Sequence, residues 1–152
     1  VRDTRRMAGQ GKPIQPMIVP LSESRAIAFL RDFDPSHKLY VSHTEDGGRS
    51  WSAARPTEME NPSSPVAALG LGGGRILMAV NDEAARADIL RLVLSEDEGE
   101  TWRVLETFTG EGALRYPMLR RLATGEIILT YSKGTKQGVV AHLFAPAWVA
   151  AR

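Results

Sequence analysis

The sequence predicts an all-β protein built as three repeated blades, each an antiparallel sheet of four strands, of the kind that makes up a β-propeller. Two observations predict this fold. The pattern [Ser/Thr]-x-Asp-x-Gly-x-x-Trp occurs at 44–51 and again at 95–102, so its copies lie 51 residues apart. Short apolar runs bounded by Gly and Pro recur at nearly the same spacing. A period of about 40–50 residues is typical of one propeller blade.

Each copy of the pattern predicts a tight turn closed by a tryptophan. The carboxylate can accept hydrogen bonds from backbone N–H groups one or two residues further on, and the hydroxyl can act similarly. The glycine permits positive φ, and the tryptophan covers the turn and packs between neighbouring sheets. The residues are Thr44, Asp46, Gly48 and Trp51 in the first copy and Ser95, Asp97, Gly99 and Trp102 in the second. We interpret these residues as structural, and neither Asp as catalytic.

The repeat extends beyond the two turns and sets the predicted blades. Leu21, Leu71 and Leu122 each follow a proline at similar distance, and each precedes a turn and an apolar run. Such runs predict buried strands rather than helices. We therefore expect a flexible lead-in over 1–12 and a three-blade unit over 13–152, with blades at about 13–56, 61–107 and 112–150. No convincing long helix is expected, and the segment from Glu83 to Asp88 is either one helical turn or a loop.

Strand direction predicts which end of the blades carries a ligand site. The Asp-containing turn follows strand three, so it lies at the opposite end from the start of strand one and the end of strand two. Polar residues occupy equivalent places at that second end: Gln15 and Arg31, Ser64 and Asn81, and Tyr116 and Ser132. A propeller's axial mouth is a concave place where ligands are expected. The alternative interpretation is that these residues only solvate strand ends.

Composition excludes several classes of function. The formal net charge is +1 without a Lys/Arg run, so no nucleic-acid partner is expected. The chain has no cysteine, and its three histidines are scattered, so neither a metal site nor a cofactor is expected. No apolar stretch approaches the roughly 20 residues of a membrane span. The basic N-terminus lacks the apolar core of a signal peptide, so location stays open, with the cytoplasm as default.

The repeated turn resembles the Asp box of bacterial neuraminidase (sialidase) repeats. From Lys12 to Trp148 the chain is similar to the C-terminal half of predicted bacterial sialidases, through phrases such as Ile14-Gln-Pro16, Ala28-Phe-Leu-Arg31 and Arg115-Tyr-Pro117. The resemblance implies a six-bladed propeller. It also implies that three arginines bind the sugar carboxylate and that a tyrosine, paired with a glutamate, is the nucleophile.

Carried over residue by residue, the resemblance gives Arg31 the role of one carboxylate-binding arginine and Tyr116 that of the nucleophile. Arg86 is a weaker candidate for a second arginine, whereas Arg91 and Arg115 are expected to be exposed strand charges. The chain departs from the family where the activating glutamate is expected, eleven residues before Arg31, because Pro20 stands there. A first arginine and an acid–base aspartate come from N-terminal blades in the family. Full sialidase activity is therefore not expected.

Three blades do not close a ring, because propellers usually have about 4–8. We hypothesise that two chains pair as a homodimer to form six blades. The alternative is a fragment whose other blades lie elsewhere. The function expected first is binding of an anionic carbohydrate at the axial mouth by Arg31, Asn81, Arg86, Gln15 and Ser64. The alternatives are an active exo-glycosidase of sialidase type using Tyr116, and a scaffold propeller without a small ligand.

Overall fold

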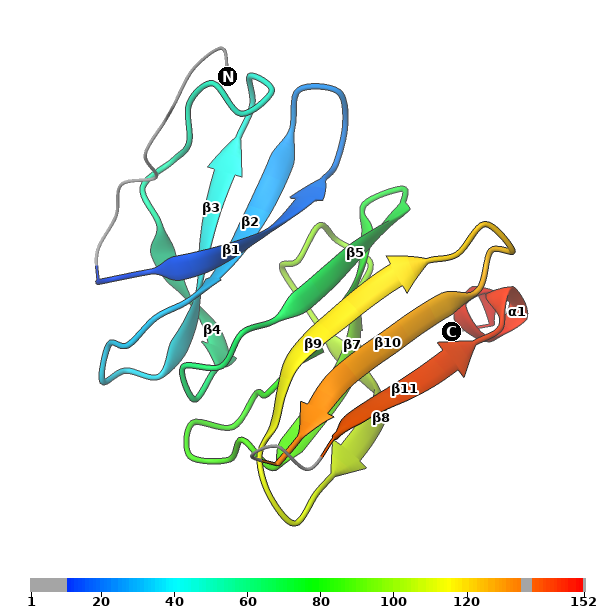
Figure 1. The fold of residues 1–152 in the computed structure, drawn as a ribbon. Coiled ribbons are helices and arrows are strands. Elements are labelled where there is room, and N and C mark those ends of the chain that lie inside the picture. Colours follow the sequence, from blue (N-terminus) through cyan, green and yellow to red (C-terminus); the bar gives the residue numbers. More distant parts are fainter. Residues whose placement is uncertain (1–10, 135–137, 152) are drawn as a thin grey trace.

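Eleven strands form three antiparallel sheets in the computed structural model, which describes residues 11–134 and 138–151 (Figure 1). The first sheet comprises β1 (Ile14–Pro20), β2 (Ala26–Arg31), β3 (Lys38–Thr44) and β4 (Arg55–Glu60). The second comprises β5 (Ala67–Gly72), β6 (Arg75–Val80), β7 (Ile89–Ser95) and β8 (Arg103–Thr109). The third comprises β9 (Leu114–Arg121), β10 (Ile127–Lys133) and β11 (Val139–Phe144), and a short helix α1 (Pro146–Ala150) follows.

Each sheet is a meander, with consecutive strands paired in chain order. The first strands of the three sheets, β1, β5 and β9, run side by side in the same direction, and the sheets fan out from them (Figure 1). This is the arrangement of successive propeller blades, with the first strands nearest the axis. The all-β prediction and the antiparallel sheets are confirmed. The first sheet ends at Glu60 and the second at Thr109, slightly beyond the predicted 56 and 107.

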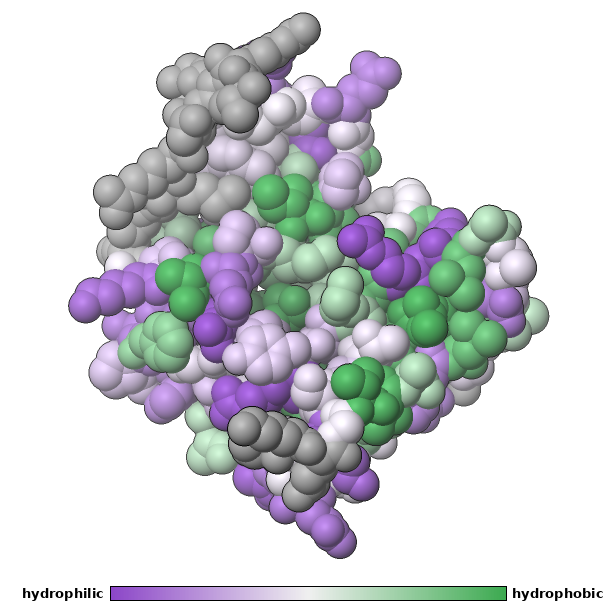
Figure 2. All heavy atoms as spheres, in the orientation of Figure 1, coloured by the Kyte–Doolittle hydropathy of each residue, from purple (hydrophilic) through white to green (hydrophobic). Residues whose placement is uncertain are grey.

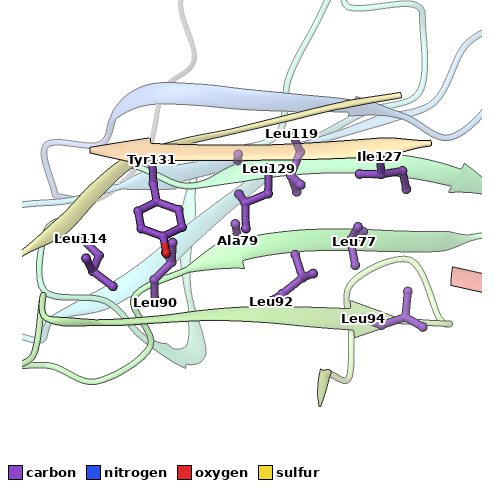
Figure 3. Close-up of a cluster of buried hydrophobic side chains, with 11 residues drawn as sticks. Leu77, Ala79, Leu90, Leu92, Leu94, Leu114, Leu119, Ile127, Leu129 and Tyr131 are labelled. Atoms are coloured by element: carbon purple, nitrogen blue, oxygen red, sulfur yellow. The ribbon is translucent and has the colours of Figure 1, made fainter. Parts of the chain in front are cut away.

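Two hydrophobic clusters join the three sheets. The first lies between the first and second sheets and contains Ile27, Phe29 and Met78 among its buried members. The second lies between the second and third sheets, where Leu77, Leu92 and other residues of the second sheet meet side chains of the third (Figure 3). The second sheet is thus buried on both faces, which explains why β6 is apolar at every position from 76 to 80 instead of alternating.

The third sheet differs from the prediction of four strands, because it has three among the described residues. After β11 the chain turns into α1 in place of a box turn and a fourth strand. Trp148 of α1 packs against the cluster between the second and third sheets, with its ring 4.6 Å from that of Phe144. A tryptophan therefore covers this end of the third sheet as well, although it reaches the cluster from a helix.

The predicted lead-in over 1–12 lies mostly outside the described residues. At its end, the Lys12 backbone N–H donates to the buried Asp32 carboxylate at 2.7 Å. In the described part of the chain, no helix has the length and apolarity needed to cross a membrane. The same part contains no group of three or more His, Cys, Asp or Glu side chains placed to hold a metal ion. The loop at Glu83 to Asp88 contains turns but no helix.

Candidate functional site

Strand register defines two opposite ends of the molecule. In the first sheet Ala26, at the start of β2, pairs with Thr44 of the box, whereas Arg31, at the end of β2, pairs with Ile14 at the start of β1. We call the end with the two box turns the box end and the end with Arg31 the mouth end. The third sheet has the same polarity, since Ser132 pairs with Arg115 beside Tyr116. The mouth end is where the sequence predicted the ligand site.

The box end is built by two equivalent hydrogen-bond networks. In the second box, the Asp97 carboxylate accepts from the Ser95 hydroxyl at 2.8 Å and from the Thr101 N–H at 2.9 Å. The Gly99 N–H donates to the Ser95 oxygen at 2.8 Å. The first box repeats these bonds: Asp46 accepts from the Thr44 hydroxyl and the Ser50 N–H, and the Gly48 N–H donates to the Thr44 oxygen.

Both box carboxylates are held ionised by these bonds. The hydrogen bonds from Ser50 lower the pKa of Asp46 to about 2, and those from Thr101 lower the pKa of Asp97 to about 2. A carboxylate whose oxygens accept backbone and hydroxyl bonds favours its charged form. Each Asp is therefore ionised at neutral pH and accepts hydrogen bonds inside its turn. A carboxylate without a proton to donate cannot act as a general acid at that pH.

Arg31 lies at the mouth end of the first sheet, where it pairs with Ile14. Its side chain is half-buried, and its Nη1 donates to the backbone oxygen of Ser63 at 2.9 Å, so it crosses from the first sheet to the loop before β5. Its Nε is buried without a hydrogen-bond partner in the structure. Among residues 11–134 and 138–151, no carboxylate forms an ion pair with Arg31. Its positive charge is thus fixed in place by a backbone carbonyl and left without a neutralising acid in the described chain.

Two neighbours of Arg31 were missed by the sequence reasoning. The ring of Phe33 lies 5.1 Å from the Arg31 guanidinium carbon, and Phe33 is 60% exposed. Ser63 has a φ of 57°, which turns its carbonyl in the loop that Arg31 contacts. The sequence shows an aromatic residue two positions after Arg31, but neither its exposure nor its contact with the guanidinium. The left-handed backbone at Ser63 is not apparent from the sequence either, because serine has no strong preference for it.

Gln15 and Tyr116 occupy equivalent bulges at the mouth end. Gln15 has a φ of 52° and Tyr116 a φ of 55°, each where the first strand of its sheet shifts register. The bulge turns both side chains outward, and Tyr116 is 57% exposed. Bulges of this kind are frequent next to binding sites because they redirect a side chain. In the described part of the chain, the Tyr116 phenol contacts no carboxylate by a hydrogen bond.

Ser64 and Asn81 lie at the mouth end but inside the protein. Both are 0% exposed. The Asn81 amide donates to the backbone oxygens of Ala87, Ile89 and Leu114, so it joins the second sheet to the start of the third. The Ser64 N–H donates to the Asn61 side chain at 2.8 Å. The Asn81 side chain thus positions backbone, whereas the Ser64 hydroxyl is buried without a hydrogen-bond partner among the described residues. Neither side chain reaches the surface.

Arg86 and Arg91 are both neutralised by acids. Arg86 forms two bonds to Asp88, from Nε at 2.8 Å and from Nη2 at 2.7 Å, and these bonds raise the pKa of its guanidinium. Arg91 pairs with Asp82 and Glu83. A guanidinium already in a bidentate pair has few donors left for a second carboxylate. Arg86 is therefore a weaker ligand candidate than Arg31, whose guanidinium has no such partner in the described chain.

The place of the family's activating glutamate lies at the other end. Pro20 pairs with Ala26, which pairs with Thr44, so Pro20 belongs to the box end. Glu23 lies in the same β1–β2 turn, where the Ser24 oxygen accepts from the Gly47 N–H of the box. Neither residue can reach Tyr116 at the mouth end. The β1–β2 turn therefore supplies no carboxylate that could replace the family's glutamate beside Tyr116.

A cavity of about 530 Å³ lies between the first and second sheets and extends from Trp102 at the box end to Glu60 and Asp82 at the mouth end. Its lining includes Val41, Met59 and Trp102 on the apolar side and Arg55, Glu60 and Asp82 on the polar side. His43 also lines it, and burial lowers the pKa of this histidine. Cations and anions are mixed around this cavity. It therefore has no preference by charge for an anionic ligand, in contrast to the position of Arg31.

Comparison with known proteins identifies the repeat. Residues 2–129 match the BNR repeat-like domain family. No curated protein sequence matches the chain. Among solved structures, it resembles the intramolecular trans-sialidase from Ruminococcus gnavus with a TM-score of 0.68 and 18% identity, over 92% of this chain and 34% of that one.

Two further solved structures show the breadth of this fold. The NanB sialidase from Streptococcus pneumoniae matches with a TM-score of 0.62 and 15% identity, over 85% of this chain and 21% of that one. The α-L-arabinofuranosidase Arb93A from Fusarium graminearum matches with a TM-score of 0.60 and 15% identity, over 87% and 45%. The chain thus spans between about a fifth and a half of the solved structures it resembles. At these identities the likeness establishes the fold.

Proposed function

Because the chain belongs to the BNR repeat-like domain family, we propose that it is a sialidase-like propeller unit that binds an anionic carbohydrate at its mouth end. The observation that carries this proposal is Arg31, whose charge is anchored by the Ser63 carbonyl and unpaired within the described chain. A planar guanidinium donates to both oxygens of a carboxylate, so sugars with a carboxylate are the ligand class that it suits best.

The surroundings of Arg31 support a sugar rather than a simple anion. Phe33 offers an exposed ring next to the guanidinium, and the apolar face of a sugar ring can lie against such a surface. Gln15 is exposed near the strand start that pairs with Arg31 and can donate to or accept from a hydroxyl. An internal ion pair at Arg31 would favour a pure scaffold, and the described residues contain none.

A second candidate function, glycoside hydrolysis of sialidase type, is favoured by the position of Tyr116. Its phenol is 57% exposed at the mouth end and its backbone is held in the left-handed region, which is typical of functional positions. The acid–base partners that this chemistry needs are not among the described neighbours of Tyr116. Release of product from fluorogenic sialosides and glucuronides by the chain, compared with Tyr116→Phe, separates hydrolysis from binding alone.

The binding proposal is tested by saturation-transfer NMR with sialic acid and glucuronic acid, using glucose as the uncharged comparison. We expect transfer to both acids and little to glucose. Arg31→Gln should weaken binding about ten-fold or more, since a hydrogen bond to a charged group contributes about 1.5–3 kcal/mol. Arg103→Gln, an exposed arginine on β8, is the matched control and should bind as the parent does. Absence of transfer to any anionic sugar, or unchanged binding by Arg31→Gln, contradicts the proposal.

A further inference from the structure

The second box shows how one blade packs on the blade before it. A side chain added at Gly99 would lie 3.2 Å from the Phe29 ring and 3.5 Å from Ile27, both in the first sheet. Trp102 stands edge-on to Phe29, with ring centroids 5.8 Å apart at 70°. The box of the second sheet is therefore seated directly on strand two of the first sheet.

The first box has the same residues without that neighbour. A side chain added at Gly48 would meet only atoms of Trp51 within 4 Å. Beside it lies a groove of about 410 Å³, which we call the first-sheet groove, lined by Ile18, Thr44, Gly48 and Trp51 among others. Ile18 is 44% exposed there. The groove thus has the glycine and tryptophan of a box, and in residues 11–134 and 138–151 no strand of another sheet packs against them.

The third sheet has an exposed surface that is equivalent to the one against which the second box packs. Ile128 and Thr130 occupy in β10 the positions that Ile27 and Phe29 occupy in β2, counted from the turn before each strand. Strand pairing puts Thr130 beside Met118 and Ile128 beside Leu143, on the face turned away from the second sheet. We call these four residues, with Val139, the third-sheet open face.

The third-sheet open face exposes a large apolar area. Met118 is 55% exposed, Leu143 56% and Val139 73%. Figure 2 shows hydrophobic side chains over the sheet of β9, β10 and β11 beside charged ones, on the side seen in Figure 1. Exposed apolar patches of this kind mark interaction sites on soluble proteins. The corresponding faces of the first and second sheets are covered by the next sheet along the chain.

We propose that two copies of this chain associate about a two-fold axis, with the third-sheet open face of each copy in the first-sheet groove of the other. Each copy presents one surface and receives the other, so the two contacts are identical and close the pair into a ring. Propellers close with about 4–8 blades, and the described residues of each copy form three sheets. Two copies therefore bring six such sheets together, which lies within this range. The ring of two also brings both copies of Arg31 to one shared mouth.

Solution mass from light scattering after size exclusion, over a dilution series, tests this assembly. We expect a dimer near twice 16.6 kDa that dissociates on dilution. Leu143→Glu places a charge on the third-sheet open face without touching the core, and it should give a monomer. Val104→Glu is the matched control, because Val104 is 53% exposed on the outer strand β8, and it should remain a dimer.

The other outcomes overturn the proposal. A parent chain that stays monomeric at high concentration excludes the contact, and a mass above two copies excludes ring closure. A Leu143→Glu variant that remains dimeric excludes the assigned face. If circular dichroism finds Leu143→Glu unfolded, Met118→Glu on the same face is measured instead and is interpreted in the same way. Sugar binding is measured on the separate Arg31→Gln variant, so failure of the dimer and failure of the binding proposal are distinguishable.

Discussion

The two box turns have nearly identical internal hydrogen bonds and differ in what they pack against. Both hold an Asp carboxylate with the same set of hydroxyl and N–H donors, and the pKa of both carboxylates falls to about 2. The second box is seated on Phe29 of the neighbouring sheet, whereas the tryptophan of the first box packs on a small cluster of its own sheet. The turn therefore forms from local residues alone, and its packing depends on a neighbouring blade.

This contrast explains what the repeated motif can and cannot indicate. A motif satisfied by its own hydrogen bonds predicts a turn wherever it occurs, independently of the chemistry at the other end of the blade. The groups that suit a ligand lie at the mouth end, where the sheets do not repeat the same residues: Arg31, Asn81 and Ser132 are equivalent in position and different in type. The proposed ligand site therefore lies at the end whose residues vary between sheets, whereas the hydrogen-bonded box turns lie at the end whose residues repeat.

Removing the Phe29 ring, against which the second box packs, should have the largest effect on stability. Phe29 is 1% exposed and contacts Trp102, so Phe29→Ala should lower the free energy of unfolding by about 3–5 kcal/mol. Thr130→Ala, at the equivalent position of the third sheet, should change it by less than about 0.5 kcal/mol. Urea unfolding measures both, in the Leu143→Glu background so that a single chain is compared. Equal losses at the two positions would mean that the sheets do not use equivalent faces.

The box glycines give a smaller and closely matched comparison. Gly48 has a φ of 83° and Gly99 a φ of 95°, so alanine costs about 1–2 kcal/mol of backbone strain at either position. At Gly99 the new methyl group also meets Phe29 at 3.2 Å, and overpacking of this kind costs about 1–3 kcal/mol more. Gly99→Ala should therefore unfold at a lower urea concentration than Gly48→Ala. The reverse order would show that the first sheet moves to accommodate the new methyl group without loss of stability.

The pH dependence of stability should be the smallest effect and should be the same for both boxes. The pKa of Asp46 and of Asp97 falls from an ordinary value of 3.8 to about 2 in the folded protein. Each carboxylate therefore contributes stability that is fully present above about pH 4 and is lost as the pH falls toward 2. Asp46→Asn and Asp97→Asn should each flatten that acid limb by a similar amount in thermal unfolding. If either variant loses stability with falling pH as steeply as the parent chain does, the box carboxylates are not the cause of that loss.

Much of the fold follows from the sequence because the repeat fixes it. The spacing of the two boxes and of Leu21, Leu71 and Leu122 predicts three meanders with the boxes at one end, and the strand register agrees. The fourth strand expected in the third sheet is replaced by α1, where Trp148 covers the cluster that a box tryptophan would cover. A helix of five residues has too short a periodic pattern to be recognised in a sequence.

The candidate site was less predictable, because position along a strand does not determine burial. Arg31 and Tyr116 lie at the mouth end with reachable side chains, whereas Asn81 and Ser64 at equivalent positions are buried. Asn81 is buried where the loop at Ala87 and the starts of β7 and β9 offer it three carbonyls, at Ala87, Ile89 and Leu114. The pairing of Arg86 with Asp88, two residues away, could have been anticipated from their spacing. The contact of Arg31 with Phe33 depends on loop geometry that no repeat encodes.

The most direct test of the separation between the two ends is a crossed measurement on three proteins. Thermal unfolding and saturation transfer from sialic acid are recorded for the parent chain, Arg31→Gln and Asp97→Asn. We expect Arg31→Gln to lose transfer and keep its unfolding temperature. We expect Asp97→Asn to unfold at a lower temperature and, below that temperature, to keep transfer. Loss of transfer in folded Asp97→Asn together with full transfer in Arg31→Gln would place the site at the box end instead.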